Sequence, residues 1–261
     1  RDRYRKNSKW IKYFSLRIVS HSRINFIAYL KRNIMHNYIS ALIYYGGVTM
    51  RKYEDKYVIK RNYSSIPSKM NVTENVIRQS VIHCYDTLDM IDQNLTQRGA
   101  SKLSGLVELA NLSSIVGNLL GAGFAENSNN CYIRNRPHTY PDLISVNNAL
   151  PGIEIKTALL KNSPKGHQPK PGYYLTYRYC LTDENGHRIS GTENSWDTVT
   201  IWEIKFGYLE AEDFSCSNTD GDSGKTAVIK TTSFNKMALL YLDTELIPYR
   251  HSIQKPYNGY N

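Results

Sequence analysis

Residues 136–157 read Arg-Pro-His-Thr-Tyr-Pro-Asp-Leu-Ile-Ser-Val-Asn-Asn-Ala-Leu-Pro-Gly-Ile-Glu-Ile-Lys-Thr. A short apolar run, residues 143–146, follows Pro141-Asp142, and two turn-forming pairs, Asn147-Asn148 and Pro151-Gly152, then break the chain. Residues 153–156 alternate between apolar and charged side chains. Two apolar runs joined by turn residues are typical of adjacent strands, so the stretch predicts a β-hairpin.

The alternation in the second strand places Glu154 and Lys156 on one face and Ile153 and Ile155 on the other. Asp142, at the end of the neighbouring strand, is then expected to lie across from Glu154. Two carboxylates, with a backbone carbonyl such as that of Ile155, are suitable ligands for Mg²⁺. A lysine beside such an ion can orient the attacking water and offset developing negative charge at a phosphodiester. The alternative is an ordinary sheet whose solvent face carries a Glu and a Lys.

Pro141-Asp142 followed by Glu154-Ile155-Lys156 resembles the motif of the PD-(D/E)XK nuclease superfamily, which includes most type II restriction endonucleases. The order of expected elements extends the resemblance over residues 100–245. The resemblance implies a Mg²⁺-dependent, site-specific hydrolase of double-stranded DNA. Asp142, Glu154 and the Ile155 carbonyl would bind the metal, with Mn²⁺ or Ca²⁺ as substitutes, and Lys156 would act on the water. It also implies a homodimer in which each subunit cuts one strand.

Residues 101–120 show a strong helical pattern, and Gly121-Ala122-Gly123 is expected to end the helix. Glu108 falls on the same stripe of this helix as Leu112 and Leu119. A carboxylate on an apolar stripe needs a partner. Because a helix before the Pro-Asp strand often supplies an acid in the superfamily, Glu108 is a candidate third ligand and catalytic residue. The alternative is a Glu at the edge of the stripe that pairs with a Lys or Arg.

A second Glu-X-Lys, Glu203-Ile204-Lys205, lies in the expected strand 198–209, with Asp197 upstream. Asp197 and Glu203 would lie on one strand, about 20 Å apart at ~3.3 Å per residue. That separation excludes a shared metal ion. Glu203 and Lys205 are instead predicted to form a solvent-facing or dimer-facing row.

Positive charge is concentrated at the start of the chain. Residues 1–60 hold 14 Lys and Arg against 3 Asp and Glu, whereas residues 61–261 hold 19 against 20. Basic residues interleave with apolar ones at helical spacing over residues 8–46, which predicts amphipathic basic helices. This pattern favours a polyanionic partner, namely DNA. A solvated basic face without a partner, or a helix lying on an anionic membrane, would also produce it.

The expected fold class is α/β, a mixed central sheet of four or five strands flanked by helices. Residues 1–66 are predicted to form a basic, mainly helical DNA-contacting segment, and residues 67–261 the nuclease core with a C-terminal tail. A helix capped by Thr73 or Asn71, strands over 173–181, 198–209 and 227–232, and a short helix over 236–242 complete the core. The basic loop 160–172 is expected to lie along DNA.

No apolar run is long enough to span a membrane, and the basic start does not resemble a secretory signal. The four cysteines are widely spaced, which argues against a zinc site and is consistent with a reducing cytoplasm. Two further functions remain open: a structure-directed repair or junction-resolving nuclease of the same fold, and a non-catalytic DNA-binding protein.

Overall fold

The computed structural model describes residues 51–147, 149–217 and 226–248. The predicted helices of residues 8–46, most of the basic segment and the C-terminal tail therefore lie outside the described residues. Residues 51–66 form short 3-10 turns that contact the strands, with Tyr53 stacked on Tyr241 and an isolated bridge between Val58 and Tyr241. The boundary predicted after Ile66 therefore does not separate these residues from the core.

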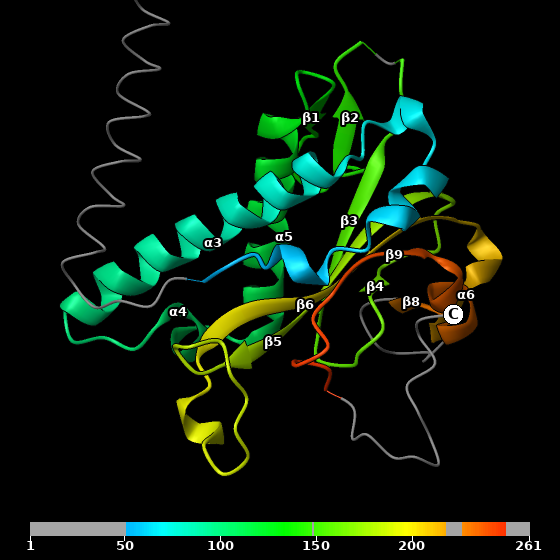
Figure 1. Cartoon of the computed structure of the whole chain (residues 1–261). Coiled ribbons are helices and arrows are strands. Elements are labelled where there is room, and N and C mark those ends of the chain that lie inside the picture. The colour runs from blue at the N-terminus through cyan, green and yellow to red at the C-terminus, as the bar shows by residue number, and fades with distance from the viewer. Residues whose placement is uncertain (1–50, 148, 218–225, 249–261) are drawn as a thin grey trace, which may run out of the picture. The chain divides into compact units, whose positions relative to one another are not determined.

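The central element is a six-stranded mixed sheet of order β1-β2-β3-β5-β6-β9 (Figure 1). Its strands are β1 (Tyr132–Arg134), β2 (Leu143–Ser145), β3 (Ile153–Leu159), β5 (Gly172–Thr182), β6 (Thr198–Leu209) and β9 (Ala238–Leu242). Only the β3–β5 pair is parallel. The predicted hairpin of residues 143–157 is confirmed as β2 and β3. The α/β class and the mixed sheet are as predicted, but the sheet has six strands where four or five were expected.

Two long helices, α3 (Glu74–Gln97) and α5 (Leu109–Asn127), cover one face of the sheet. The Val76 N–H donates to Thr73 Oγ1, so Thr73 caps α3 as its sequence predicts. Apolar side chains at helical spacing, among them Ile77, Val81 and Leu88, then face the sheet and are buried. These side chains build the main hydrophobic core.

The helix expected over residues 101–120 differs at both ends. It is interrupted at Val107 and Glu108, which separate the short α4 (Leu103–Leu106) from α5, and α5 continues past the glycines to Asn127. A Cβ at Gly123 would lie 2.7 Å from His83 Cβ and 2.9 Å from the Ser80 carbonyl oxygen. Gly123 is therefore inside the helix because α3 and α5 pack too closely for a side chain there, and it does not end the helix.

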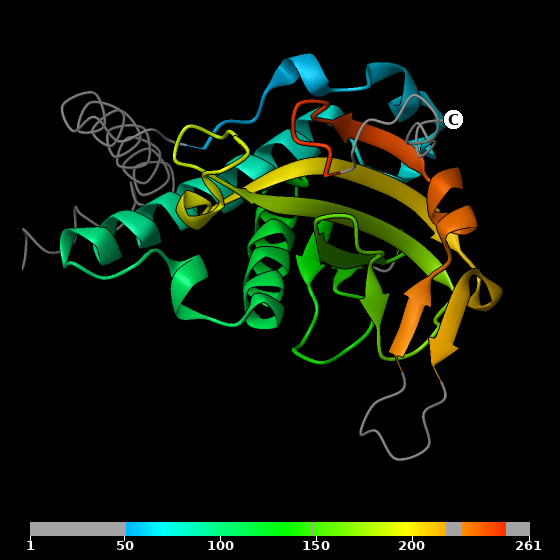
Figure 2. The same ribbon diagram turned by 90° about the horizontal axis from the view of Figure 1, so that it is seen from below.

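The opposite face of the sheet carries a small three-stranded sheet of order β4-β8-β7 and the short helix α6 (Thr231–Lys236). Its strands are β4 (Lys165–Gly166), β7 (Phe214–Ser217) and β8 (Thr226–Ile229). Figure 2 shows α6, β7 and β8 at the end of the sheet remote from α4. The predicted helix over 236–242 is wrong, because the helix is α6 and residues 238–242 form the edge strand β9.

Candidate metal and phosphate site

Asp142 and Glu154 lie directly opposite each other where β2 begins. Leu143 pairs with Ile153 in an antiparallel register, so Asp142, one residue earlier, faces Glu154. The Asp142 N–H donates to Glu154 Oε2 at 3.1 Å, and the Ile155 N–H donates to Asp142 Oδ2 at 2.8 Å. The two acids are therefore adjacent on one face of the sheet, and both are held by backbone groups.

Lys156 is on the same face as Glu154, and its ammonium forms an ion pair with Glu154 Oε1. The opposite side chains of β3 contact α5: the Thr157 hydroxyl donates to the Ser113 carbonyl at 2.8 Å. A Cβ at Gly166 in β4 would lie 3.3 Å from Lys156 Cε. The connection between β3 and β5 thus passes over Lys156 and partly shields it, which leaves 24% of its side chain exposed.

Burial raises the pKa of Glu154, and so does the neighbouring negative charge of Asp142, while Lys156 opposes both effects. A cation shared by the two acids would relieve the cost of keeping them ionised together. Asp142 Oδ1 makes no hydrogen bond to any described residue, so it has a lone pair available for such a cation. The Ile155 carbonyl points to the same side as its N–H, toward Asp142, since both groups of a strand residue face one neighbour.

These three oxygen donors fit a hard divalent ion, which prefers carboxylate and carbonyl ligands and keeps several waters. One of these donors, Glu154 Oε1, already accepts a hydrogen bond from the Lys156 ammonium. A bound ion would therefore compete with Lys156 for this oxygen. Lys156 would then be released toward whatever lies beside the ion.

Glu108 does not join this pair. It is exposed at the N-cap of α5, and α5 packs against the face of β3 that carries Ile155 and Thr157. Glu154 points from the opposite face, and within the described residues no group of three or more His, Cys, Asp or Glu side chains is arranged to hold a metal ion. Glu108 is not on the apolar stripe predicted for it, because α5 begins only after this residue.

The second Glu-X-Lys is buried in the protein core, so the prediction of a solvent-facing or dimer-facing row is wrong. Glu203 and Lys205 are 1% and 0% exposed. Arg178 forms a two-pronged ion pair with Glu203, at 2.6 Å for Nη2–Oε1, and stacks 4.3 Å from the Trp202 ring. The Lys205 ammonium donates to the Phe234 carbonyl, and burial lowers the pKa of Lys205 to about 8. This motif is a buried polar network under α6.

Two tyrosines beside the acids hold the end of the 160–172 connection, and the sequence analysis missed both. The Tyr140 hydroxyl donates to the Pro171 carbonyl at 2.9 Å, and the Tyr174 hydroxyl donates to the Lys170 carbonyl at 2.7 Å. The Lys170 ammonium lies 4.8 Å from the centre of the Tyr140 ring. The position of Tyr140 directly before Pro141-Asp142 was the available signal.

The polar residues of the 127–138 loop are less closely tied to the acids. Arg134 donates to Asn118 Oδ1 at 2.7 Å, while Arg136 and His138 are exposed. His167, in the connection between β3 and β5, is exposed as well. None of these four side chains forms a hydrogen bond or ion pair with Asp142 or Glu154 among the described residues.

No model of a known protein family matches the chain, and no curated protein matches it. Within the described residues, no helix has the length and apolar character needed to span a bilayer. The geometry of Asp142, Glu154 and Lys156 is therefore the basis for assigning a function.

Proposed function

We propose that this protein is a divalent-metal-dependent endonuclease that hydrolyses phosphodiester bonds in double-stranded DNA. The observation that carries the proposal is the side-by-side placement of Asp142 and Glu154, with Lys156 on the same face of β3. This grouping agrees with what the resemblance to the PD-(D/E)XK superfamily implies for the same three residues.

Each residue has a defined task in the proposed reaction. Asp142 and Glu154, with the Ile155 carbonyl, hold the metal ion, and the N–H groups of Asp142 and Ile155 keep the two carboxylates oriented. When bound, the ion supplies Lewis acidity toward the phosphate and lowers the pKa of a water ligand. Lys156, released from Glu154, hydrogen-bonds the attacking water and offsets the negative charge that develops on the phosphate.

The substrate class follows from charge. The 14 basic residues among the first 60 favour a polyanion, and phosphate contacts of this kind release counterions from DNA. Within this class we propose a type II restriction endonuclease that acts as a homodimer on a palindromic site. Sedimentation of the purified protein at micromolar concentration tests the dimer, and a monomer under those conditions would contradict it.

Plasmid digestion tests the activity. Wild-type protein with Mg²⁺ is expected to yield discrete fragments, and a chelator should abolish them. Lys156→Ala should lower the rate by about 10²–10³-fold, the usual cost of removing a group that stabilises a developing anion. Lys69→Ala is the matched control, because Lys69 is exposed at the end of a 3-10 turn. Its rate should stay within about twofold of wild type, since isolated surface charges contribute little.

The pattern of products separates the related functions. Discrete fragments from linear duplexes indicate a restriction enzyme, whereas cleavage confined to branched substrates indicates a junction-resolving nuclease. Binding of DNA without cleavage in Mg²⁺ or Mn²⁺ would contradict the proposal and favour a non-catalytic DNA-binding protein.

A further inference from the structure

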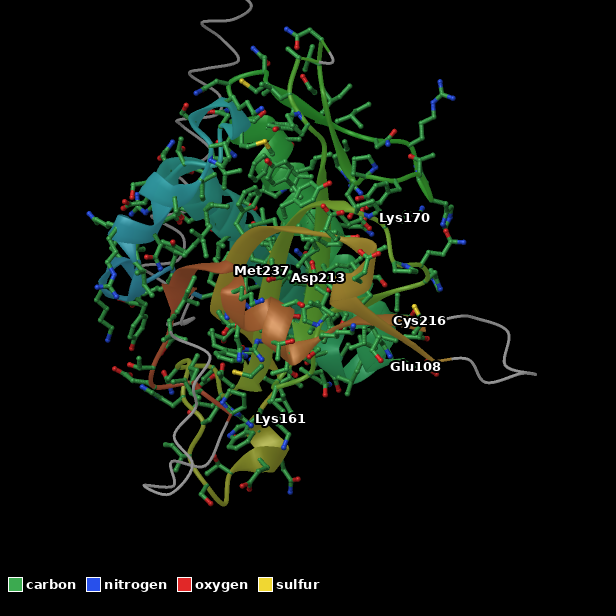
Figure 3. All side chains as sticks on the ribbon, turned by 90° about the vertical axis from the view of Figure 1, so that its right-hand side faces the viewer. Glu108, Lys161, Lys170, Asp213, Cys216 and Met237 are labelled. Carbon is green, nitrogen blue, oxygen red and sulfur yellow. The ribbon has the colours of Figure 1, made fainter. Side chains whose placement is uncertain are left out.

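A cavity of about 380 Å³ lies where β6 extends beyond its edge partner. The pairing of β6 with β9 ends at Phe206–Ala238, so residues 207–209 have no strand on that edge within the described part of the chain. The cavity walls come from the ends of β5 and β6, the turn before α3 and the α6 region, and include Tyr173, Phe206, Tyr208, Asp213, Lys236 and Met237. Asp213 and Met237 are labelled beside the orange α6 in Figure 3. This volume lies in the range of small-molecule sites.

One wall of the cavity is aromatic. Tyr173 is stacked on Phe206 with ring centres 5.7 Å apart, and its ring meets that of Tyr208 edge-on at 5.0 Å. Tyr208 nevertheless remains 51% exposed. A large ring that is oriented by its neighbours and still open to solvent is suited to stacking with a planar ligand at a small cost in conformational entropy.

The polar groups of the cavity match a nucleotide. Asp213 Oδ1 accepts from the Ser233 hydroxyl and Oδ2 from the Glu210 N–H, and these bonds lower the pKa of Asp213. The carboxylate is therefore ionised and has lone pairs left to accept N–H groups from a base edge. Lys236 is exposed at the rim and supplies a positive charge for a phosphate.

The cavity also lies near the acid pair. Glu154 pairs with Tyr174, and Tyr174 pairs with Gly207, which lines the cavity. With strands ~4.8 Å apart, the backbones of Glu154 and Gly207 are about 10 Å apart. The Tyr208 side chain is on the opposite face of the sheet from Glu154, because Tyr208 pairs with Tyr173 and Tyr173 pairs with Ile153. A nucleic acid strand bound at the acid pair would therefore have to pass around the free edge of β6 to reach the cavity.

We infer that this cavity binds one unpaired nucleobase of a DNA strand, stacked on Tyr208 and hydrogen-bonded to Asp213. The inference rests on the proposed function for its DNA substrate, and it adds a base-binding site that the Asp142–Glu154 chemistry does not require. The base is either already unpaired in the substrate or extruded from the duplex.

The test is a binding measurement in chelator, so that cleavage plays no part. The probe is a 20-base-pair duplex with a single unpaired 2-aminopurine, compared with the same duplex carrying an abasic residue there. Wild-type protein should bind the 2-aminopurine duplex about tenfold more tightly, as expected for one base–aromatic stack. The 2-aminopurine fluorescence should be quenched on binding. Tyr208→Ala should remove both the preference and the quenching, whereas Tyr208→Phe should retain them.

Ile189→Ala is the control for loss of an exposed apolar side chain, because Ile189 is 57% exposed in the β5–β6 connection. It should behave as wild type, and near-ultraviolet circular dichroism verifies that each variant is folded. Equal affinity for the two duplexes, or equal weakening of both by Tyr208→Ala, would overturn the base site. Absence of cleavage with the base preference intact would overturn the nuclease proposal alone.

Discussion

At the scale of single residues, Glu154, the proposed metal ligand, lowers the stability of the fold when it is ionised. Burial and the Asp142 charge hold its folded-state pKa above the ordinary value, so the folded protein binds this proton more tightly than the unfolded chain does. Ionised Glu154 therefore destabilises the fold above its folded pKa. This loss of stability disappears as the pH falls from the pKa of Glu154 in the folded protein to its lower pKa in the unfolded chain.

The first prediction concerns Glu154→Gln. This variant should be more stable than wild type at pH 7, and the difference should shrink as the pH is lowered toward 4. Urea denaturation at several pH values measures it. Mg²⁺ should stabilise only the wild type, by ~2.7 kcal/mol at 100 times Kd. A less stable variant at pH 7, or one that Mg²⁺ stabilises equally, would contradict this account of the site.

Glu203 differs from Glu154, because its buried carboxylate is stabilised by a two-pronged ion pair with Arg178. Glu203→Gln removes the carboxylate that forms the ion pair with the buried Arg178, so the free energy of unfolding should fall by about 3–5 kcal/mol. Glu245→Gln breaks the exposed Lys56–Glu245 pair and should leave the free energy of unfolding nearly unchanged, because solvent screens an exposed pair. Chemical denaturation compares the two. A small loss for Glu203→Gln would show that the buried pair is not needed for folding.

At the scale of elements, the close contact of α3 with α5 depends on glycine. Gly123→Ala would place a methyl group against the Ser80 carbonyl, and we expect a loss of about 1–3 kcal/mol. Gly117 is the matched control in the same helix, since its Cβ would lie at an ordinary 3.5 Å from Thr157. Gly117→Ala should be neutral or should stabilise by up to about 1 kcal/mol through helix propensity. Equal effects of the two substitutions on thermal unfolding would exclude close packing as the reason for Gly123.

Local pattern was sufficient for some elements and misleading for others. The alternation in 153–156 and the β-rich run 198–209 identified β3 and β6, and the hairpin turns placed Asp142 opposite Glu154. Gly121-Ala122-Gly123 was wrongly predicted to end the helix. Glycine is present at position 123 because α3, about 40 residues away in the sequence, packs closely against it. The prediction for Glu203 and Lys205 was wrong for the same reason. These residues are buried by contacts with Arg178 and α6, and the local spacing of residues does not indicate such contacts.

At the scale of the whole molecule, the connection between β3 and β5 determines access to the candidate site. Parallel neighbours require a crossover, and here it contributes β4 to the small sheet over the Glu154 face. From the sequence, this segment is expected to be a loop lying along DNA. Its pairing with β8, and its anchoring by Tyr140 and Tyr174, depend on contacts between distant segments.

The excess positive charge and the acid pair lie in different parts of the sequence. The described core carries the acid pair, while the excess positive charge lies in residues 1–60. If this excess neutralises DNA phosphates, each lost contact should reduce the slope of log affinity against log salt by about 0.9. The triple substitution Lys9→Gln, Lys12→Gln, Arg17→Gln should therefore weaken DNA binding at low salt and reduce the slope by up to about 3.

The same variant should keep its cleavage rate once the enzyme is saturated with DNA, because the substitutions do not touch Asp142, Glu154 or Lys156. Arg98→Gln is the control, an exposed basic residue at the end of α3, and it should change neither affinity nor slope. Fluorescence anisotropy across 50–300 mM salt, with single-turnover cleavage at saturation, measures both quantities. An unchanged slope in the triple variant would mean that the basic residues form a solvated surface, and the DNA contacts would then have to come from the core itself.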